Sequence, residues 1–256
     1  MARTLPASLP RLVLTRQARS NGTGLTTLEA IVMAAGEGRR LRPITERWPK
    51  PVLPIDGRPV IGTLLRELAA AGVERVAVVT GHLAAQVESL VGDGSRWGLE
   101  VRFVSQPRPD GSADAVARAL EKTPVLVLGA DTVFSPGDIG RFLESAGGEA
   151  AVAVRRDPPP DPPHRSAVAT KDGRVTRILD DDPANPLGGA PLWLVTDAVA
   201  AHLRMDAPPY ELGNAFQAAI EEGGVVHAVE IGKTRDLTDP LDLVEENFPW
   251  LERHPR

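Results

Sequence analysis

Residues 30–54 of the chain read AIVMAAGEGRRLRPITERWPKPVLP, an apolar run followed at once by two glycines and several basic side chains. The apolar run begins at Leu28 and predicts a buried strand. Gly36 and Gly38 permit positive φ and let backbone N–H groups approach an anionic ligand closely. Four of the cations that follow within fifteen residues of the first glycine are Arg39, Arg40, Arg42 and Lys50. This combination predicts a loop that binds phosphate groups.

Two other kinds of glycine-rich loop fit this segment less well. A dinucleotide-binding loop has the spacing G-x-G-x-x-G and runs straight into a helix, whereas here the third glycine is missing and Pro43 stands where the helix would begin. A Walker A loop needs G-x-x-x-x-G-K-[ST], which the sequence lacks. A tight turn beside a basic surface patch is the simplest non-functional interpretation. The length of the full string, through Pro49-Lys50-Pro51, favours phosphate binding instead.

The chain around this loop alternates strand-like and helix-like segments. The expected strands are Leu28–Ala34, Arg75–Thr80, Glu100–Ser105 and Pro124–Gly129. The expected helices are Val60–Ala71, Leu83–Leu90 and Ser112–Lys122. Continuous apolar strands separated by helices predict an α/β fold in three layers, with a Rossmann-like, mostly parallel sheet covered on both faces. Ligands of such sheets bind beyond the carboxyl ends of the strands, where the glycine-rich loop lies.

Residues 150–195 have a different pattern, which predicts a smaller mixed β region. Ala150–Val154 is strand-like and is followed by a stretch with five prolines, which lack the N–H that a sheet requires. Lys171-Asp172-Gly173 is typical of a hairpin turn. We expect this region to form one wall of the ligand site. The remaining expected elements are strands Ser166–Thr170, Arg174–Leu179, Leu192–Val195 and Val225–Ile231, an irregular stretch Pro183–Pro191, and helices Asp197–Leu203, Glu211–Glu222 and one from about Pro240.

The composition excludes several classes of protein. Hydrophobic residues make up 42% and charged residues 25%, as in ordinary globular domains. The absence of cysteine excludes disulfides, iron–sulfur clusters and cysteine-ligated zinc. A net charge of −5 and 4% aromatic residues argue against nucleic-acid binding. We expect one domain over residues 28–256, and the sequence leaves a homo-oligomer open.

The first 27 residues carry four arginines and no acidic residue. The apolar stretch Leu9–Leu14 is broken by Pro10 and Arg11, so it is too short for a signal peptide. We expect residues 1–27 to be a disordered tail or the product of an overcalled start codon, with a transit peptide as the alternative. No apolar run approaches the roughly 20 residues of a membrane-spanning helix. A cytoplasmic location and no membrane partner are therefore expected.

The glycine-rich segment resembles the nucleotidyltransferase family that makes NDP-sugars. The signature of that family runs roughly AAG-x-G-x-R-L-x-P-x-T and is followed by PKP. Ala34–Thr45 (AAGEGRRLRPIT) and Pro49–Pro51 match it almost position for position. The resemblance extends from residue 28 to about residue 250. It implies the α/β fold of nucleotide-diphospho-sugar transferases.

The resemblance implies roles for the residues of the loop. In the family, the backbone of the AAG segment holds the nucleotide, and this role falls to Ala34, Ala35, Gly36 and Gly38. The arginine before the leucine binds the β- and γ-phosphates, which corresponds to Arg40. The PKP lysine bridges the phosphates of the two substrates, which corresponds to Lys50. A cation between two anions lowers the electrostatic barrier to their approach.

The resemblance also implies a Mg²⁺ site with two carboxylates. Asp131 follows the apolar run Val125–Gly129, where the family has its metal-binding aspartate. The second ligand of the family lies in a late D-[IL]-G-T-P-x-D-L string, which Asp236–Leu243 matches with substitutions. Asp236 is therefore the candidate for the second ligand. Two carboxylates with phosphate oxygens and waters suit the coordination of Mg²⁺.

A third matched segment concerns the nucleobase. Gln106 and Gly111-Ser112-Ala113 resemble the segment in which the family reads a pyrimidine edge with an amide side chain and glycine backbone. Ser112 replaces the threonine of the family and Asp110 replaces its apolar residue. An amide both donates and accepts hydrogen bonds, as a base edge requires. UTP or dTTP is therefore the expected nucleotide.

The chain departs from the family on the sugar side. Where the family has Glu-Lys-Pro, with the lysine on the sugar phosphate, this chain has Asp181-Asp182-Pro183. Acidic side chains there oppose the binding of an anion. The sequence leaves open three explanations: another cation holds the phosphate, the acceptor is unusual, or activity is weak. The arginines available for this role are Arg155, Arg156 and Arg165.

The implied reaction is transfer of a nucleoside monophosphate from an NTP to a sugar 1-phosphate with release of diphosphate, an EC 2.7.7 type of activity. Two alternatives remain at this point. One is a non-catalytic nucleotide-sugar-binding paralogue that has lost the sugar-phosphate lysine. The other is a nucleotidyltransferase for a non-hexose phosphomonoester such as phosphocholine. A Rossmann oxidoreductase is disfavoured by the missing third glycine and by Pro43.

Overall fold

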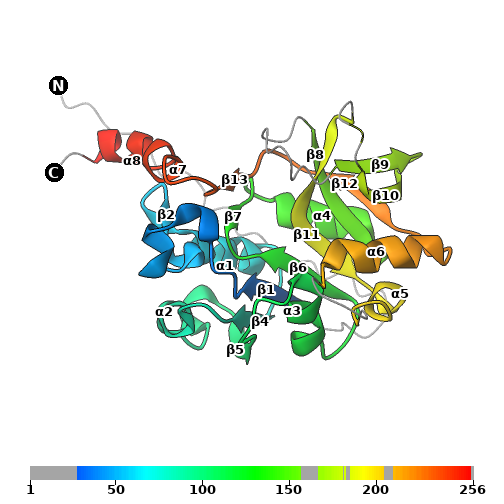
Figure 1. Cartoon of the computed structure of the whole chain (residues 1–256), viewed down its shortest axis with the longest axis horizontal. Helices are drawn as coiled ribbons and strands as arrows, with labels where there is room; N and C mark the ends of the chain where they lie inside the picture. Colours follow the sequence, from blue (N-terminus) through cyan, green and yellow to red (C-terminus); the bar gives the residue numbers. More distant parts are fainter. Residues whose placement is uncertain (1–27, 157–166, 181, 183–184, 205–209, 255–256) are drawn as a thin grey trace, which may run out of the picture.

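The computed structural model of the protein describes residues 28–156, 167–180, 182, 185–204 and 210–254. A nine-stranded sheet runs through its centre (Figure 1). Its strands are β1 (Glu29–Ala34), β4 (Arg75–Thr80), β5 (Glu100–Ser105), β6 (Val125–Gly129), β8 (Ala151–Arg156), β9 (Ala167–Lys171), β10 (Arg174–Asp180), β11 (Leu187–Val195) and β12 (His227–Glu230). Their spatial order is β5-β4-β1-β6-β11-β8-β12-β10-β9. The expected tail at residues 1–27 lies outside the described residues.

Helices cover both faces of this sheet. One face carries α1 (Val60–Ala70), α2 (Ala84–Val91) and α4 (Asp138–Ala146), and the other carries α3 (Ser112–Ala119), α5 (Asp197–Ala200) and α6 (Leu212–Glu221). Successive residues of a strand point to opposite faces. Val32 therefore joins the core under α1 and α4, while its neighbour Ile31 joins the core under α3 and α6. The three expected layers are present.

The sheet is mostly parallel in strand direction, as expected, but it is mixed, because β11 and β10 run opposite to the other seven strands. Strands β5, β4, β1 and β6 are mutually parallel. Strand β11 then enters antiparallel to both β6 and β8, and β10 is antiparallel to both β12 and β9. The β region expected at residues 150–195 is thus hydrogen-bonded into the same sheet through β11.

Two elements differ from the sequence expectations. The patterns described above do not predict α4, although Ile139, Phe142 and Ala146 lie at helical spacing and are buried. Strand β11 begins at Leu187, inside the stretch expected to be irregular. Its pairing with β8 shifts register between Gly189 and Trp193, and this irregularity accommodates the unfavourable strand residues around Pro191.

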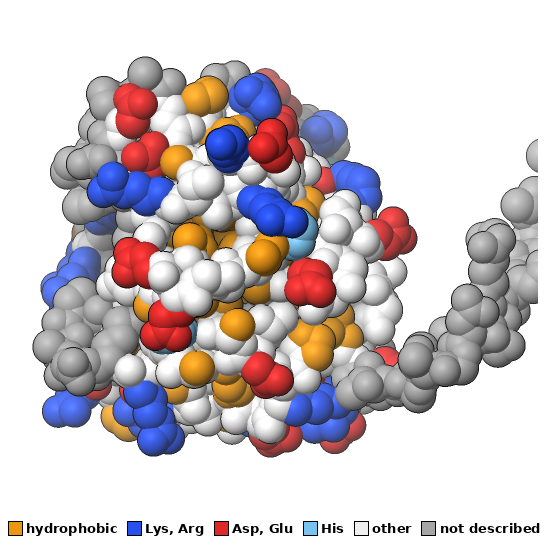
Figure 2. All heavy atoms as spheres, turned by 90° about the vertical axis from the view of Figure 1, so that its right-hand side faces the viewer, with side chains coloured by type: hydrophobic (Ala, Val, Ile, Leu, Met, Phe, Trp, Pro, Cys, Tyr) orange, Lys and Arg blue, Asp and Glu red, His pale blue; other side chains and the backbone are white. Residues whose placement is uncertain are grey.

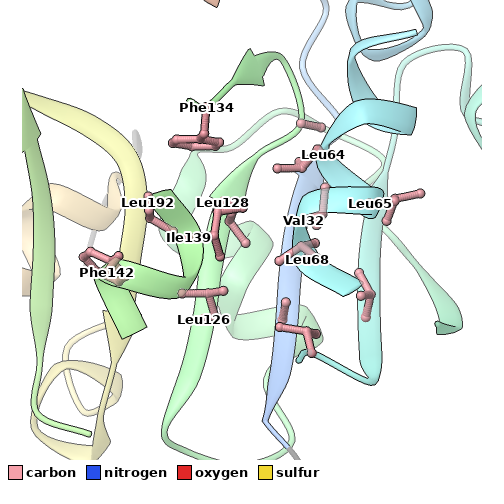
Figure 3. Packing of buried hydrophobic residues seen from close by; sticks show 14 of the residues in the cluster. Val32, Leu64, Leu65, Leu68, Leu126, Leu128, Phe134, Ile139, Phe142 and Leu192 are labelled. Carbon is pink, nitrogen blue, oxygen red and sulfur yellow. The ribbon is translucent and has the colours of Figure 1, made fainter. Parts of the chain in front are cut away.

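The core under α1 and α4 is formed by large aliphatic and aromatic side chains (Figure 3). Leu64 and Leu68 extend from α1, and Phe142 extends from α4, toward the strands between them. Leu126 and Leu128 of β6 lie between the two helices and are fully buried. Close packing of this kind fixes the position of β6, whose carboxyl end leads into the ligand site.

The carboxyl-terminal segment docks on a small hairpin at one end of the molecule (Figure 1). The hairpin consists of β2 (Pro54–Ile55) and β3 (Arg58–Pro59), and the segment forms α7 (Asp242–Glu245) and α8 (Phe248–Arg253). The side chain of Asn247 donates to the carbonyl of Pro54 at 2.8 Å and accepts from Gly57 N–H at 2.9 Å. Arg235 pairs with both Asp56 and Glu246, which ties the strand before α7 to the same hairpin.

Charges of both signs alternate on the face that carries β9, β10 and α6. Figure 2 shows acidic and basic side chains next to one another there, with single apolar side chains between them. A mixed surface of this kind does not form the single-signed patch that nucleic-acid binding uses. Among the described residues, no helix combines the length and the apolar character needed to cross a membrane.

We expect Phe142→Ala to lower the free energy of unfolding by about 3–5 kcal/mol, because a fully buried aromatic ring is replaced by a cavity. Urea denaturation followed by circular dichroism measures the change. Phe248→Ala is the matched control, since that ring is 53% exposed on α8 and its removal should change stability by no more than about 0.5 kcal/mol. Equal effects of the two substitutions would contradict the packing described.

Candidate functional site

A pocket of about 290 Å³ opens at the carboxyl ends of β1 and β6. Four parts of the chain line it: the glycine-rich segment from Met33 to Leu41, Lys50 with Pro51, Asp131, and Leu237 with Thr238. These parts come from both ends of the sequence, and the carboxyl ends of parallel strands are the usual location of ligands in such sheets.

The glycine-rich segment is held in shape by its own side chains. Gly38 adopts φ +61° and precedes a short 3₁₀ helix, Arg39–Leu41. The buried Thr45 hydroxyl donates to the carbonyl of Gly38 at 2.9 Å, and Leu41 is buried beside Leu237. Because Leu41 is held inward, the preceding Arg40 lies at the pocket wall, as the resemblance implies.

The predicted nucleotide-binding residues of this segment are mostly in place. Ala34, Gly36 and Gly38 line the pocket. A Cβ added at Gly36 would meet no atom within 4 Å, so the space in front of this backbone is open to a ligand. Ala35 is buried behind the wall, and its carbonyl accepts a hydrogen bond from His82 N–H at 3.2 Å. Ala35 therefore supports the segment and does not line the pocket.

Lys50 points into the site and is not a solvated surface lysine. Its side chain is only 15% exposed, and its Nζ donates to Oδ2 of Asp131 at 2.5 Å. The residue begins a short 3₁₀ helix, Lys50–Val52. Lys50 stands between Pro49 and Pro51, which restrict the backbone on either side of it. The structure thus brings together a predicted catalytic cation and a predicted metal ligand.

Asp131 lies just past the end of β6, as expected. The strand residue Gly129 leaves room for its carboxylate, since a Cβ there would lie 2.9 Å from Oδ1 of Asp131. Strand β7 (Thr132–Val133) follows directly and pairs antiparallel with β13 (Arg235–Asp236).

The pairing of β7 with β13 places Asp236 beside Asp131. Asp236 lies opposite Thr132 in the register, and the Thr132 hydroxyl donates to Oδ1 of Asp236 at 2.5 Å. The two residues that were predicted to bind the metal are therefore neighbours, although 105 positions separate them in the sequence. Their metal-binding role itself remains a prediction.

The electrostatics of this pair suit a divalent cation. Burial raises the pKa of Asp236 above its usual range, and the nearby charge of Asp131 adds to the shift, while Thr132, Arg155 and Lys50 act in the opposite direction. Two adjacent carboxylates offer the hard oxygen ligands that Mg²⁺ prefers. No cluster of three or more metal-binding side chains occurs among the described residues.

Gln106 and Gly111, predicted to read the nucleobase, contact each other but do not line the pocket. Gln106 is buried, and its Nε2 donates to the carbonyl of Gly111 at 3.0 Å and to Asp114 at 2.8 Å. Gly111 adopts φ +124°, and a Cβ there would lie 2.4 Å from the carbonyl oxygen of Tyr210. Gln106 therefore shapes this loop, and no local sequence pattern indicates the contact with Tyr210.

The sugar-side residues are described in part. Asp180 accepts a hydrogen bond from Asn185 at 2.8 Å, and Asp182 is exposed, whereas Asp181, Pro183 and Arg165 lie outside the described residues. Of the other two arginines considered for the sugar phosphate, Arg156 pairs with Glu230 away from the carboxylates. Arg155 lies at the site, with Nη1 at 3.3 Å from Oδ2 of Asp236.

Several residues of the site were not predicted from the sequence. Thr132 and Thr234 bond to the predicted metal ligand Asp236, and Leu237 and Thr238 line the pocket. The signal for Leu237 and Thr238 was present, because they directly follow Asp236 in the late matched string. No local pattern marks Thr132 or Thr234, since their role depends on the pairing of β7 with β13.

Comparison with known proteins identifies the family. The model described as nucleotidyl transferase matches residues 29–179. A glucose-1-phosphate thymidylyltransferase from Streptomyces griseus is 31% identical over 238 residues, covering 88% of this chain and 66% of the relative. The chain thus spans slightly less than two thirds of that relative's length. These matches show that the chain belongs to the nucleotidyl transferase family, the sugar-phosphate nucleotidyltransferases that its loop resembles.

Two further proteins extend the comparison. A CMP-5'-(3-aminopropyl)phosphonate synthase from Streptomyces rubellomurinus is 35% identical over 183 residues, covering 67% of this chain and 28% of the relative. A UDP-glucose pyrophosphorylase from Acinetobacter baumanii shares the fold, with a TM-score of 0.75 at 20% identity over 90% of this chain and 95% of that one.

We expect Asp236→Asn to stabilise the metal-free protein near neutral pH. Because the pKa of Asp236 is raised, the folded state binds this proton more tightly than the unfolded state, so the ionised carboxylate disfavours folding. The wild-type protein should gain stability relative to the variant as the pH falls through the raised pKa. Urea denaturation in EDTA at about pH 7.5 and about pH 5 measures both differences.

Glu144→Gln is the control for this experiment, since Glu144 is an exposed acid outside the site. It should leave stability unchanged at both pH values. An Asp236→Asn variant that is less stable than wild type near neutral pH would contradict the electrostatic description.

Proposed function

We propose that this member of the nucleotidyl transferase family transfers a nucleoside monophosphate from an NTP to a sugar 1-phosphate and releases diphosphate. The observation that carries the proposal is the 2.5 Å contact between Lys50 and Asp131 in the pocket behind the glycine-rich segment. It joins a cation for the phosphates and a carboxylate for a divalent ion in one place. Relatives named as glucose-1-phosphate thymidylyltransferases support the same reaction.

The residues of the pocket account for a displacement at the α-phosphorus. An acceptor phosphate oxygen is already ionised at neutral pH, so the attack requires no general base. Arg40 and the open backbone at Gly36 hold the departing diphosphate, and Lys50 lies where the two substrates' phosphates meet. Fixed cations at these positions stabilise charge that develops in the transition state.

Mg²⁺ is the cofactor that we propose for Asp131 and Asp236. When bound, it would neutralise phosphate charge and align the triphosphate. Occupation of the carboxylates would release Lys50 from its ion pair with Asp131. Lys50 then has its full charge available for phosphate oxygens.

We propose UTP or dTTP as the nucleotide. The loop that Gln106 holds resembles the pyrimidine-reading segment of the family, and relatives named for thymidylyl and uridylyl transfer support this choice. The buried amide of Gln106 keeps the Gly111 backbone in a fixed position, and that backbone is the candidate for contact with the base edge.

A second acceptor class is favoured by one specific observation. The relative named as a CMP-5'-(3-aminopropyl)phosphonate synthase shows that one protein of this family is named for a product that contains no sugar acceptor. The acidic sequence Asp181-Asp182-Pro183 also departs from the pattern of the sugar-phosphate enzymes. Phosphomonoesters and phosphonates other than hexose phosphates are therefore the alternative acceptors.

A matrix of NTPs against acceptors, read by diphosphate release with and without Mg²⁺, tests the proposal. The acceptors should include glucose 1-phosphate, mannose 1-phosphate, phosphocholine and 3-aminopropylphosphonate. Release that requires Mg²⁺, an NTP and a sugar 1-phosphate supports the main proposal. Nucleotide binding without release from any pair would favour a non-catalytic nucleotide-sugar-binding protein instead.

We expect Asp131→Ala to abolish Mg²⁺-dependent diphosphate release, because it removes one of the two carboxylates proposed to bind Mg²⁺. This carboxylate is also the one that lies against Lys50. The same assay at saturating NTP measures the loss. Glu144→Ala, an exposed acid on α4, is the control and should keep wild-type turnover. Turnover of Asp131→Ala at the wild-type rate would refute the metal assignment.

Lys50→Gln should lower kcat by roughly 10²–10³-fold, because it removes a preorganised cation from the reacting phosphates. Steady-state kinetics in both substrates measure the effect. Lys171→Gln removes a lysine from the exposed hairpin between β9 and β10 and should leave kcat unchanged. A kcat for Lys50→Gln within about twofold of wild type would exclude Lys50 from the chemistry.

A further inference from the structure

Arg155 lies at the edge of the site, and only part of its hydrogen-bonding capacity is used by the described residues. It lies near the end of β8, and its side chain is 16% exposed. Its Nη1 contacts the hydroxyl of Thr234 and lies 3.3 Å from Oδ2 of Asp236. Its Nε is buried and has no hydrogen-bond partner among the described residues. Buried N–H groups almost always have a hydrogen-bond acceptor, so the unpartnered Nε of Arg155 indicates a position where a ligand would supply one.

The geometry of the guanidinium shows which kind of ligand fits. Nε–H and one N–H of Nη2 point the same way, as a fork that matches two oxygens of one phosphate. The protein contacts of Arg155 are made by Nη1, on the other side of the group. The fork therefore faces away from Asp236 and Thr234. A lysine could not present two parallel donors in this way.

The position of Arg155 separates it from the nucleotide pocket. Lys50 contacts Asp131 on the side of the glycine-rich segment, while Arg155 contacts Asp236 from β8, in the region expected to form the acceptor's wall. Arg155 does not line the nucleotide pocket. The two cations thus contact different carboxylates of the pair, Lys50 at Asp131 and Arg155 at Asp236.

We propose that the Nε–Nη2 edge of Arg155 binds the phosphate or phosphonate group of the acceptor. The inference rests on the proposed function, because it assigns an acceptor to the same site. Arg155 supplies the positive charge that Asp182 cannot supply, since the sequence has Asp181-Asp182-Pro183 where the family has a lysine. Its fork recognises a tetrahedral oxyanion and not a sugar ring, so it serves sugar phosphates and simpler phosphonates alike.

Arg155→Met and Arg155→Lys test the proposal, with Arg156→Met as the matched control. Arg156 is the next residue on β8, and it pairs with Glu230 at 2.9 Å away from the carboxylates. Binding of glucose 1-phosphate and of 3-aminopropylphosphonate is measured by calorimetry. The protein is loaded with Mg²⁺ and the non-reacting α,β-imido analogue of the NTP that it binds most tightly.

Arg155→Met should weaken binding of the preferred anion at least about tenfold and raise its KM equally, with nucleotide affinity unchanged. Arg155→Lys should recover part of the loss by charge alone, and Arg156→Met should bind as wild type does.

Two results would overturn the inference. The first is an Arg155→Met variant that binds the anion with wild-type affinity. If such a variant only needed more Mg²⁺, Arg155 would serve to hold Asp236 and not to bind the acceptor. The second is a wild-type protein that binds neither anion. The proposed function is judged separately, by diphosphate release from wild type. Anion binding that depends on Arg155, without any release, would leave the inference standing and overturn the proposed function.

Discussion

The proximity of two carboxylates is the constraint on which the site depends. Asp131 and Asp236 lie side by side in partly buried surroundings, where like charges repel and lose hydration. The protein offsets this cost with one cation beside each carboxylate: Lys50 contacts Asp131, and Arg155 contacts Asp236. The offset is incomplete, because the pKa of Asp236 stays raised. A pair of acids held in this state suits the divalent cation that we propose for it, and metal binding there would free the two neighbouring cations for anionic ligands.

A short antiparallel pairing of two strands places the two carboxylates next to each other. Strands β7 and β13 contribute only two residues each, yet their register decides that Asp236 faces Thr132 and so lies next to Asp131. The ion pairs of Arg235 with Asp56 and Glu246 hold β13 from the other side and connect it to the docked carboxyl-terminal helices. Segments far from the pocket thereby contribute to the placement of a single carboxylate.

Local features of the sequence predicted the loop and the two acids, but not the contacts between distant segments. The string from Ala34 to Pro51 is long enough to specify a conformation, and most of its predicted site residues line the pocket. Strand direction was not predictable in the same way, because the apolar run Leu192–Val195 has the same pattern in a parallel and an antiparallel strand. The partners of Gln106 and the choice of Arg155 among three arginines likewise depend on pairing between remote strands.

Strand β11 has a mechanical consequence for the whole molecule. It is hydrogen-bonded to β6 on one edge and to β8 on the other, so the half of the sheet that carries the glycine-rich segment and the half that carries Arg155 share one ladder, which is irregular only between Gly189 and Trp193. A hinge rotation that separated the halves would have to break that ladder. Motion that keeps the ladder intact is therefore confined to the connecting loops, and the spacing between the two halves is set once, when the sheet folds.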